Sequence, residues 1–338
     1  MAKKINNLWP KIISWDCLLY SWRQARKGKR YKPAAMEFAQ KWEENLLNIH
    51  NHLIWGTWRP MPLSTFPVFT PKYRIIEAPA FQDRIVHHAM YAHLEPVFDR
   101  SFIFDSYACR KNKGIHRAAF RVQNFLKRAH RNWGQVYVLQ GDIASYFPSI
   151  LHGRLLRQIA KKIKDRRVMQ LWKMLLRSLN RQKGLPIGAL VSQLGANIYL
   201  DAMDHLIKDE LGEKYYTRYM DDWLLLSPSK SHLWSRLELI KEFLLDDLGL
   251  SLNPKTRIFP AKQGVDFAGY RVWRSHILPR KRNVAAARRR IKKLVRLYEA
   301  RKIALETLQG STASFLGYSK HCAANYAVEN VLKELPSK

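Results

Sequence analysis

The sequence predicts an α+β fold, because a buried strand and a strand hairpin alternate with long helical segments. Residues 135–140, QVYVLQ, form a short apolar strand that runs directly into Gly141 and Asp142. Two further apolar strands flank the Met220-Asp221 turn inside TRYMDDWLLLS. Apolar residues at helical spacing precede and follow these strands along the chain. The three observations together predict a small sheet with helices attached to it.

Each remaining element follows from its own apolar pattern. Residues 64–77, STFPVFTPKYRIIE, alternate like a strand pair joined by a Pro-Lys turn. The stretch VDFAGYRVW at 265–273 predicts a hairpin, and a positively charged helical region starts at Pro279. Helical spacing predicts further helices at 34–53, ending before Gly56, and at 81–98, 114–131, 151–180, 193–212 and 231–248.

The charge of the chain predicts a polyanionic partner. The 338 residues are 47% apolar, and Lys+Arg 59 against Asp+Glu 27 gives a formal net charge of +32. So large an excess attracts nucleic acid. A membrane surface is disfavoured, because there is no apolar run of about 18 residues and no lipidation signal. The three cysteines are far apart and form no CxxC pair, which disfavours a disulfide scaffold or a zinc ribbon and fits a reducing cytoplasm.

Carboxylates at the strand ends predict the chemistry. Asp221 and Asp222 are adjacent and flanked by apolar residues, and burying two such charges is costly unless a cation neutralises them. Asp142 supplies a third carboxylate at the end of another strand. Alone, Asp142 fits a strand-end cap, and Asp221-Asp222 fits a surface turn. Together, in basic surroundings, they predict a two-metal nucleotidyl-transfer site for hard cations such as Mg²⁺.

At this point the chain resembles a reverse transcriptase. Tyr219-Met220-Asp221-Asp222 matches the YxDD box of that family, and the stretch from Asp142 to Phe147 matches its first catalytic-aspartate motif. The resemblance covers roughly residues 60–275 in order, and ordered co-occurrence of motifs is far more specific than YxDD alone. The other matching segments are PKYRIIEAPAFQDRIVHHAM, SYACRKNKGIHRAA, GLPIGALVSQLGANIYL (184–200), LGLSLNPKT (248–256) and VDFAGYRVW (265–273).

The resemblance implies a right-hand polymerase fold with fingers, palm and a short helical thumb. It also implies template RNA, an RNA/DNA hybrid and dNTPs as ligands, and no membrane partner. The implied divisions are 1–115 as N-terminal extension and fingers, 116–150 as palm with the first catalytic Asp, 151–183 as fingers helices, 184–278 as palm with the YMDD turn and primer grip, and 279–338 as helical thumb.

A closer resemblance is to reverse transcriptases of diversity-generating retroelements. The strings GLPIGALVSQLGANIYLDAMDH, SYACR followed by KG-H, and SFLGYSKHCAANY carry it. It implies mutagenic copying with frequent errors at template adenines, a structured RNA and a small basic accessory protein oligomer. It further implies a cytoplasmic protein encoded by a bacterium, an archaeon or a phage.

The family pattern implies roles for individual residues around the metals. Asp142 and Asp221 should bind both Mg²⁺ ions, for which Mn²⁺ can substitute, while Asp222 supports the site. The backbone carbonyl of Ile143 should complete the shell of the nucleotide-bound ion. These four residues are the expected metal site.

Other residues should hold the nucleotide. Arg74, with help from Lys72, should lie over the triphosphate, since a guanidinium fork suits phosphate. Phe147 should act as a steric gate that excludes a 2′-hydroxyl. Ile187 stands where many reverse transcriptases have a Gln in LPQG, so we expect weaker discrimination. Gly188 should allow close backbone approach.

The remaining expected contacts involve the template and the primer. Ser192 should cap the helix that follows the LPIG loop, and Gln193 should contact the template. Lys255 should lie near the leaving phosphate as a general acid. The expected primer grip consists of Phe267, Gly269 and Tyr270.

Three alternatives stay open at this point. One is a retron- or CRISPR-associated reverse transcriptase. Another is a non-catalytic basic RNA-binding protein built on a polymerase fold, which the presence of all three aspartates disfavours. The third is an RNA-directed RNA polymerase, which more often carries Gly-Asp-Asp at the turn.

Overall fold

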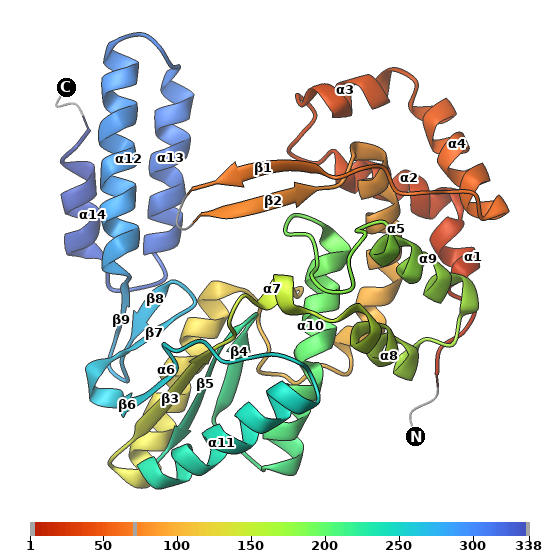
Figure 1. Cartoon of the computed structure of the whole chain (residues 1–338). Helices are drawn as coiled ribbons and strands as arrows, with labels where there is room; N and C mark the ends of the chain where they lie inside the picture. Colours follow the sequence, from red (N-terminus) through yellow and green to blue (C-terminus); the bar gives the residue numbers. More distant parts are fainter. Residues whose placement is uncertain (1–3, 70–72, 336–338) are drawn as a thin grey trace. The chain divides into compact units, whose positions relative to one another are not determined.

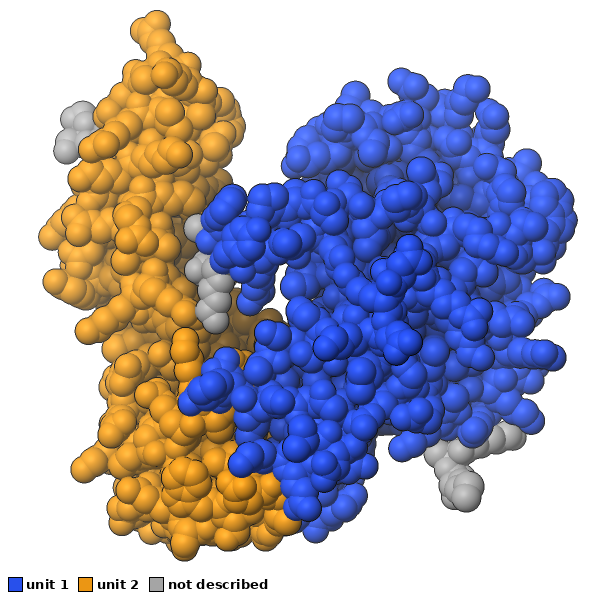
Figure 2. Space-filling view, in the orientation of Figure 1, with its two compact units in different colours: residues 1–104, 143–212, 240–254 blue, residues 105–142, 213–239, 255–338 orange. Residues whose placement is uncertain are grey.

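The computed structural model describes residues 4–69 and 73–335 of the chain (Figure 1). The chain folds into two compact units, each assembled from separate stretches of sequence (Figure 2). The first unit contains residues 1–104, 143–212 and 240–254, and the second contains residues 105–142, 213–239 and 255–338. The chain therefore passes from one unit to the other directly after Asp142.

A four-stranded antiparallel sheet forms the centre of the second unit. Its order is β4 (Tyr216–Tyr219), β5 (Asp222–Ser227), β3 (Tyr137–Asp142) and β6 (Arg257–Pro260). Helix α6 (Ile115–Trp133) packs against this sheet, because Ala118, Val122 and Phe125 share a core with Val138 and Leu224. The four-residue spacing of Ala118 and Val122 places the apolar side chains of α6 on one face.

A small sheet and a helical bundle complete the second unit. The sheet has the order β7 (Val265–Phe267), β8 (Tyr270–Val272) and β9 (Ile277–Pro279). The bundle consists of α12 (Lys281–Glu299), α13 (Leu305–Ser319) and α14 (Asn325–Leu332) (Figure 1). Ala287, Ile291 and Val295 recur every four residues along α12 and form the bundle core with Phe315 and Val331, so the many cations of α12 are left outside.

The first unit is mostly helical. Helix α5 (Phe81–Asp99) packs against α2 (Trp15–Ala25) and α10 (Leu190–His205). Strands β1 (Ser64–Val68) and β2 (Arg74–Ala78) form a separate antiparallel hairpin. The other elements of the unit are α1 (Trp9–Ile13), α3 (Pro33–Gln40), α4 (Trp42–Trp55), α7 (Tyr146–Ser149), α8 (His152–Lys162), α9 (Arg166–Arg177) and the π-helical η1 (Leu206–Glu210). Helix α11 (Lys230–Asp246) belongs partly to each unit, and the short 3-10 turn η2 (Ala261–Gln263) belongs to the second.

The α+β class is confirmed, and so are the strands around Asp142 and Met220 and the hairpin at 265–273. The single helix expected over 34–53 is wrong, because Lys41 has φ −130° and ψ 45° and separates α3 from α4. The expected helix over 151–180 is likewise two helices. Asp165 divides them, since its carboxylate accepts hydrogen bonds from the backbone N–H groups of Arg167 and Val168 and caps α9.

Two further expectations need correction or qualification. Helix α10 begins at Leu190 with Ala189 before it, so Ser192 is buried inside the helix and does not cap it. Lys72 lies outside the described residues.

Within the residues that the structure describes, no helix is both long enough and apolar enough to cross a membrane.

Candidate active site

Three carboxylates lie at one end of the central strand pair of the second unit. The register of β3 and β5 places Asp142 directly opposite Asp222. Tyr219 pairs with Asp222 across β4 and β5, so Met220 and Asp221 form a two-residue hairpin turn. Met220 has φ +58°, the left-handed conformation that such tight turns require. Asp142, Asp221 and Asp222 are all partly buried.

Gly141 is required beside Asp142 for a steric reason. It faces Trp223 across the sheet, and a Cβ atom at Gly141 would lie 2.2 Å from the indole ring. Trp223 is itself fully buried. The close packing of the ring against the glycine backbone fixes the end of β3, and with it the position of Asp142.

A buried arginine supports the hairpin turn. Arg218 is 0% exposed, and its Nη1 donates a hydrogen bond of 2.8 Å to the carbonyl oxygen of Met220. The backbone of Arg218 is also held, because its N–H donates to Asp105 at 2.9 Å and its carbonyl accepts from Tyr107 at 3.0 Å. Asp105 in turn forms an ion pair with Arg121 of α6 at 2.7 Å. The turn that presents Asp221 is thus tied to the core of its unit.

Burial perturbs the electrostatics of Asp222. Its pKa is raised from 3.8 to about 7, mainly because burial removes water from the carboxylate and also because the carboxylates of Asp142 and Asp221 lie nearby. Gln140, which donates to Asp222 Oδ1 at 3.3 Å, and the Arg280 guanidinium act in the opposite direction. A carboxylate that burial holds partly neutral near pH 7 is expected to ionise more readily beside a divalent cation.

The donor set at this strand end suits a hard cation. Asp142, Asp221 and Asp222 offer only oxygen atoms, and the carbonyl of Ile143 follows directly in the chain. In the described part of the chain, no three His, Cys, Asp or Glu side chains are gathered as a complete metal site. Mg²⁺ commonly takes one or two carboxylates and completes its shell with waters and substrate phosphates. The residues present fit that mode of binding.

The LPIG loop lies in the first unit, between β2 and the segment around α7. The carbonyl of Ile187 accepts a hydrogen bond of 3.0 Å from the N–H of Glu77, and the carbonyl of Phe147 accepts one of 2.9 Å from Leu185. Gly188 has φ +125°, and an added Cβ would lie 3.1 Å from the Ile76 side chain. The structure therefore brings the segments of Phe147, Ile187 and Gly188 together with β2.

The side chains around this loop differ in exposure. Arg74, the first residue of β2, is exposed, whereas Phe147 and Ile187 are partly buried. Tyr146 is buried beside Phe147, with ring centroids 5.7 Å apart, and its hydroxyl donates to the carbonyl of Ala196 in α10. Tyr146 is thus a core residue, which leaves Phe147 as the less buried aromatic ring of the pair.

The expected primer-grip residues have buried rings. Phe267 and Tyr270 are both 0% exposed. The Tyr270 ring stacks on Tyr318 with centroids 4.8 Å apart, and its hydroxyl lies 2.6 Å from Nδ1 of His116. Gly269 occupies the turn between them with φ +91°. The two aromatic rings therefore support the turn from the core, and any primer contact must come from the turn itself.

The last two expected residues, Gln193 and Lys255, belong to different units. Gln193 is partly buried in the first turns of α10, within the first unit. Lys255 is exposed at the start of the last segment of the second unit.

Sequence reasoning missed Arg218, Gln140 and Trp223. The place of Gln140 beside the site could have been predicted, because residues two apart on a strand face the same side and Asp142 is two residues further on. Arg218 directly precedes the YMDD turn, but its burial is set by the pairing of residues 105–107 with β4. That pairing joins segments more than a hundred residues apart and leaves no local sequence pattern.

A comparison with protein-family models decides the family. The model described as "Reverse transcriptase (RNA-dependent DNA polymerase)" matches residues 65–272. The chain belongs to the reverse transcriptase family. The match covers both β2 with Arg74 and the strand pair that carries the three aspartates.

Curated relatives of this reverse transcriptase include bacterial and mitochondrial proteins. Protein YkfC of Escherichia coli K12 is 27% identical over 271 residues, covering 67% of this chain and 70% of YkfC. The group II intron-encoded protein LtrA of Lactococcus lactis subsp. cremoris is 29% identical over 177 residues, covering 49% of this chain and 28% of LtrA. The putative COX1/OXI3 intron 2 protein of Saccharomyces cerevisiae is 25% identical, and the match spans only 29% of it.

Solved structures support the fold. Telomerase from Candida tropicalis, in complex with a fragment of telomeric RNA, matches this chain with a TM-score of 0.50 at 12% sequence identity. The match covers 87% of this chain and 58% of the telomerase chain. The right-hand α+β fold expected from the motifs is thereby confirmed. The diversity-generating subclass, the divisions into fingers, palm and thumb, and the roles of individual residues stay predictions.

Proposed function

We propose that this protein copies a template RNA into DNA by two-metal nucleotidyl transfer. The observation that carries the proposal is the register pair of Asp142 and Asp222 beside the Met220-Asp221 turn, inside a chain of the reverse transcriptase family. Asp142 and Asp221, with the carbonyl of Ile143, would hold two Mg²⁺ ions, for which Mn²⁺ can substitute. When bound, the ions supply activation of the primer 3′-hydroxyl and neutralisation of the pyrophosphate charge.

The chain's own residues then position the reactants. Arg218 and Gly141 hold the turn and the strand end, so that Asp221 and Asp142 keep a fixed geometry. Asp222 supports the site through Gln140 and is a less direct ligand than the other two. Preorganised charge of this kind is usually the largest contribution to catalysis, because it needs no rearrangement as the reaction proceeds.

Residues of the first unit are proposed to select the nucleotide. The Arg74 guanidinium, with Lys72, binds the triphosphate, and the Phe147 ring leaves no room for a ribose 2′-hydroxyl. Ile187 offers no directional hydrogen bond, so the nascent base pair is held by shape, and Gly188 lets the backbone approach. The supporting observation is that Phe147, Ile187 and Gly188 lie on adjoining segments next to β2.

The template and primer contacts are proposed from accessible residues. Gln193 contacts the template strand, and Lys255 donates a proton to the leaving pyrophosphate. The turn at Gly269, backed by Phe267 and Tyr270, positions the primer end. The exposed cations of α12 bind the phosphates of the RNA/DNA hybrid, so that affinity falls steeply with salt.

Within the family we propose the diversity-generating retroelement subclass. The motif strings named above and Ile187 in place of Gln support this assignment. Such an enzyme would make errors at template adenines, work with a small basic accessory protein oligomer and act in the cytoplasm. The alternative is a retron- or CRISPR-associated reverse transcriptase with accurate copying.

Primer extension on a defined RNA template, with Mg²⁺ and four dNTPs, tests the polymerase proposal. Asp142→Asn should abolish extension, whereas the matched change Asp246→Asn, at an exposed position on α11, should leave it intact. Extension that survives Asp142→Asn would refute the assignment of this carboxylate.

Sequencing of the same products tests the subclass. Errors concentrated opposite template adenines support the diversity-generating assignment, and accurate products favour the retron- or CRISPR-associated alternative. Ile187→Gln should restore one hydrogen bond, worth about 1 kcal/mol or roughly fivefold in selectivity. An unchanged error spectrum in Ile187→Gln would contradict the role given to this residue.

A further inference from the structure

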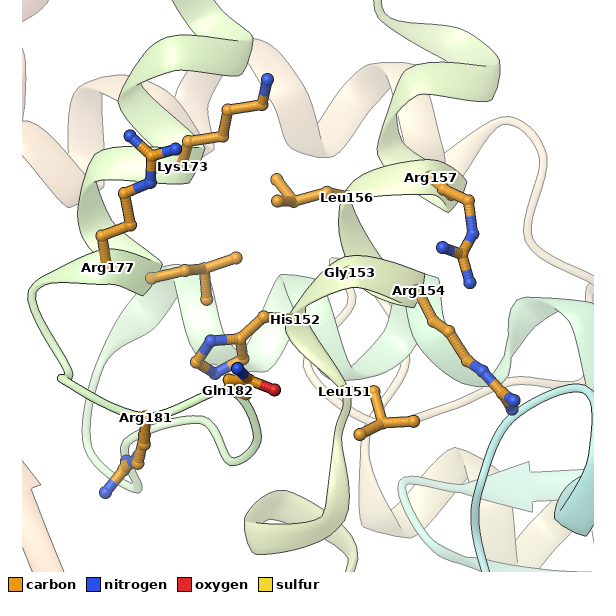
Figure 3. A pocket seen from close by; sticks show the side chains of 11 residues that line it. Leu151, His152, Gly153, Arg154, Leu156, Arg157, Lys173, Arg177, Arg181 and Gln182 are labelled. Carbon is orange, nitrogen blue, oxygen red and sulfur yellow. The ribbon is translucent and has the colours of Figure 1, made fainter.

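A basic hollow lies beside α8 and α9 in the first unit, and no motif discussed above assigns it a role (Figure 3). Its volume is about 530 Å³. Five of the 11 residues that line it are Arg or Lys, and none is Asp or Glu. The fraction of cationic residues is therefore higher here than in the whole sequence, where 59 of 338 residues are Lys or Arg. The five are Arg154, Arg157, Lys173, Arg177 and Arg181.

Helical periodicity places these cations along two rows. Arg154 and Arg157 are three residues apart on α8, while Lys173 and Arg177 are four apart on α9, so each pair lies on one side of its helix. The opposite sides of both helices are buried, through Leu155 and Ile159 on α8 and through Val168, Leu171, Trp172 and Leu175 on α9. Arg157, Lys173 and Arg177 are therefore exposed at the hollow, whereas Arg154 is partly buried.

The hollow contains more positive charge than its surroundings neutralise. Arg181 forms a bidentate ion pair with Glu77, with N–O distances of 2.7 and 2.6 Å. Among the described residues, Nη1 of Arg154 is buried and has no hydrogen-bond partner. Like charges in one hollow repel each other unless an anion lies between them. The arrangement suits an oxyanion with several acceptor atoms.

The start of α8 adds backbone donors to the same place beyond His152, whose N–H already donates to the carbonyl of Gln182 at 3.1 Å. No side chain caps the helix at Leu151, and the exposed Gly153 in its first turn has no atom within 4 Å of the position that a Cβ would occupy. The N-terminal N–H groups of a helix attract anions, so an oxygen atom can approach this backbone without a steric barrier.

The lining chemistry identifies the kind of anion. Leu151, Leu156 and Leu176 supply the apolar part, and no lining residue is Phe, Tyr or Trp, so the hollow offers cations but no aromatic ring for a base to stack on. Such a surface can bind phosphates but cannot distinguish one base from another. We propose that this hollow binds the backbone phosphates of RNA, independently of sequence. The proposal rests on the proposed function for the choice of RNA.

The hollow is joined to the LPIG loop through β2. Glu77 pairs with Arg181 at the hollow through its side chain, and its backbone N–H donates to the carbonyl of Ile187 at 3.0 Å. Glu77 therefore links the hollow, where the RNA would bind, to the loop that is proposed to hold the nascent base pair. This link gives the hollow a role in holding template during copying.

The test compares RNA binding by two variants that lose the same charge. The pocket variant carries Arg157→Gln, Lys173→Gln and Arg177→Gln, all at exposed positions in the first unit. The control variant carries Lys127→Gln, Arg128→Gln and Arg131→Gln on the exposed side of α6. Binding of a 30-nucleotide RNA is measured from 50 to 300 mM salt without dNTPs or Mg²⁺.

The pocket variant should bind RNA at least tenfold more weakly at about 100 mM salt. Its slope of log K against log salt should fall by about 2, since each lost single-strand phosphate contact removes about 0.7. The control should lose less than threefold. Equal losses in the two variants would reduce the effect to net charge and overturn the proposal. Because the assay needs no polymerisation, its outcome is separate from that of the extension assay.

A second measurement keeps the result independent of folding. Acetylation of Lys173 in the unmodified protein, followed by mass spectrometry, should slow at least fivefold when RNA is added. Protection of Lys173 by tripolyphosphate but not by RNA would show that the hollow takes a small free polyphosphate and would refute the RNA assignment. No protection by either probe would refute the site itself.

Discussion

Replacing Asp222 with Asn should stabilise the metal-free protein at alkaline pH. In the unfolded chain the Asp222 carboxyl loses its proton near pH 3.8, whereas burial raises its pKa to about 7 in the folded protein. Between these values the folded state binds one more proton, so its stability falls as the pH rises. Above pH 7 the full penalty applies, and a difference of about 3 pKa units corresponds to about 4 kcal/mol.

Thermal unfolding in EDTA measures this penalty. Asn keeps the shape and the carbonyl oxygen that accepts from Gln140, but it carries no charge. For a chain of 338 residues, about 4 kcal/mol corresponds to a rise in Tm of roughly 6 °C at pH 8. The difference should shrink to about 2 kcal/mol at pH 5. The exposed change Asp246→Asn is the control, and a Tm of Asp222→Asn at or below that of the unmodified protein at pH 8 would refute the reasoning.

Three further predictions follow from contacts around the site. Arg218→Met removes the buried donor to the Met220 carbonyl, a charged hydrogen bond worth about 1.5–3 kcal/mol, so kcat for nucleotide incorporation should fall about tenfold or more while KM for dNTP changes little. Arg218→Lys should recover part of this loss. Arg236→Met, which removes an arginine paired with Glu213, is the control, and a reduced kcat in this control would contradict a specific role for Arg218. Gly141→Ala places a Cβ against the Trp223 ring and should lower the free energy of unfolding, measured by urea denaturation, by about 1–3 kcal/mol. Part of this stability should return in the double variant with Trp223→Leu, and an unchanged stability of Gly141→Ala would disprove the steric argument. Phe147→Ala should raise incorporation of rNTPs relative to dNTPs in a primer-extension assay, whereas unchanged discrimination would show that Phe147 is no steric gate.

Local sequence patterns predicted the part of the fold that local forces determine. The apolar run before Asp142 and the two apolar strands around Met220 had to be strands beside a core, and the structure pairs them in one sheet. The motif order then predicted the family, which the match over residues 65–272 confirms. Charge and apolar spacing likewise predicted the basic helices after Pro279.

Interactions between distant segments were out of reach of the sequence. The break at Lys41 arises in a stretch whose apolar spacing continues through it, and the burial of Arg218 depends on pairing with residues near Asp105. The primer-grip aromatics show the same limit, because the pattern VDFAGYRVW does not reveal that Phe267 and Tyr270 both face the core. Side-chain direction in such short strands follows from the helices that cover them.

Catalysis by the strand-end carboxylates is tested most directly by extension of a DNA primer on an RNA template. The double variant Asp221→Ala, Asp222→Ala is compared with the unmodified protein in Mg²⁺. We expect robust extension by the unmodified protein and none by the variant, with RNA binding retained because the basic surfaces are intact. Equal extension by both proteins, or no extension by the unmodified protein together with tight RNA binding, would contradict the claim that these strand-end carboxylates catalyse DNA synthesis.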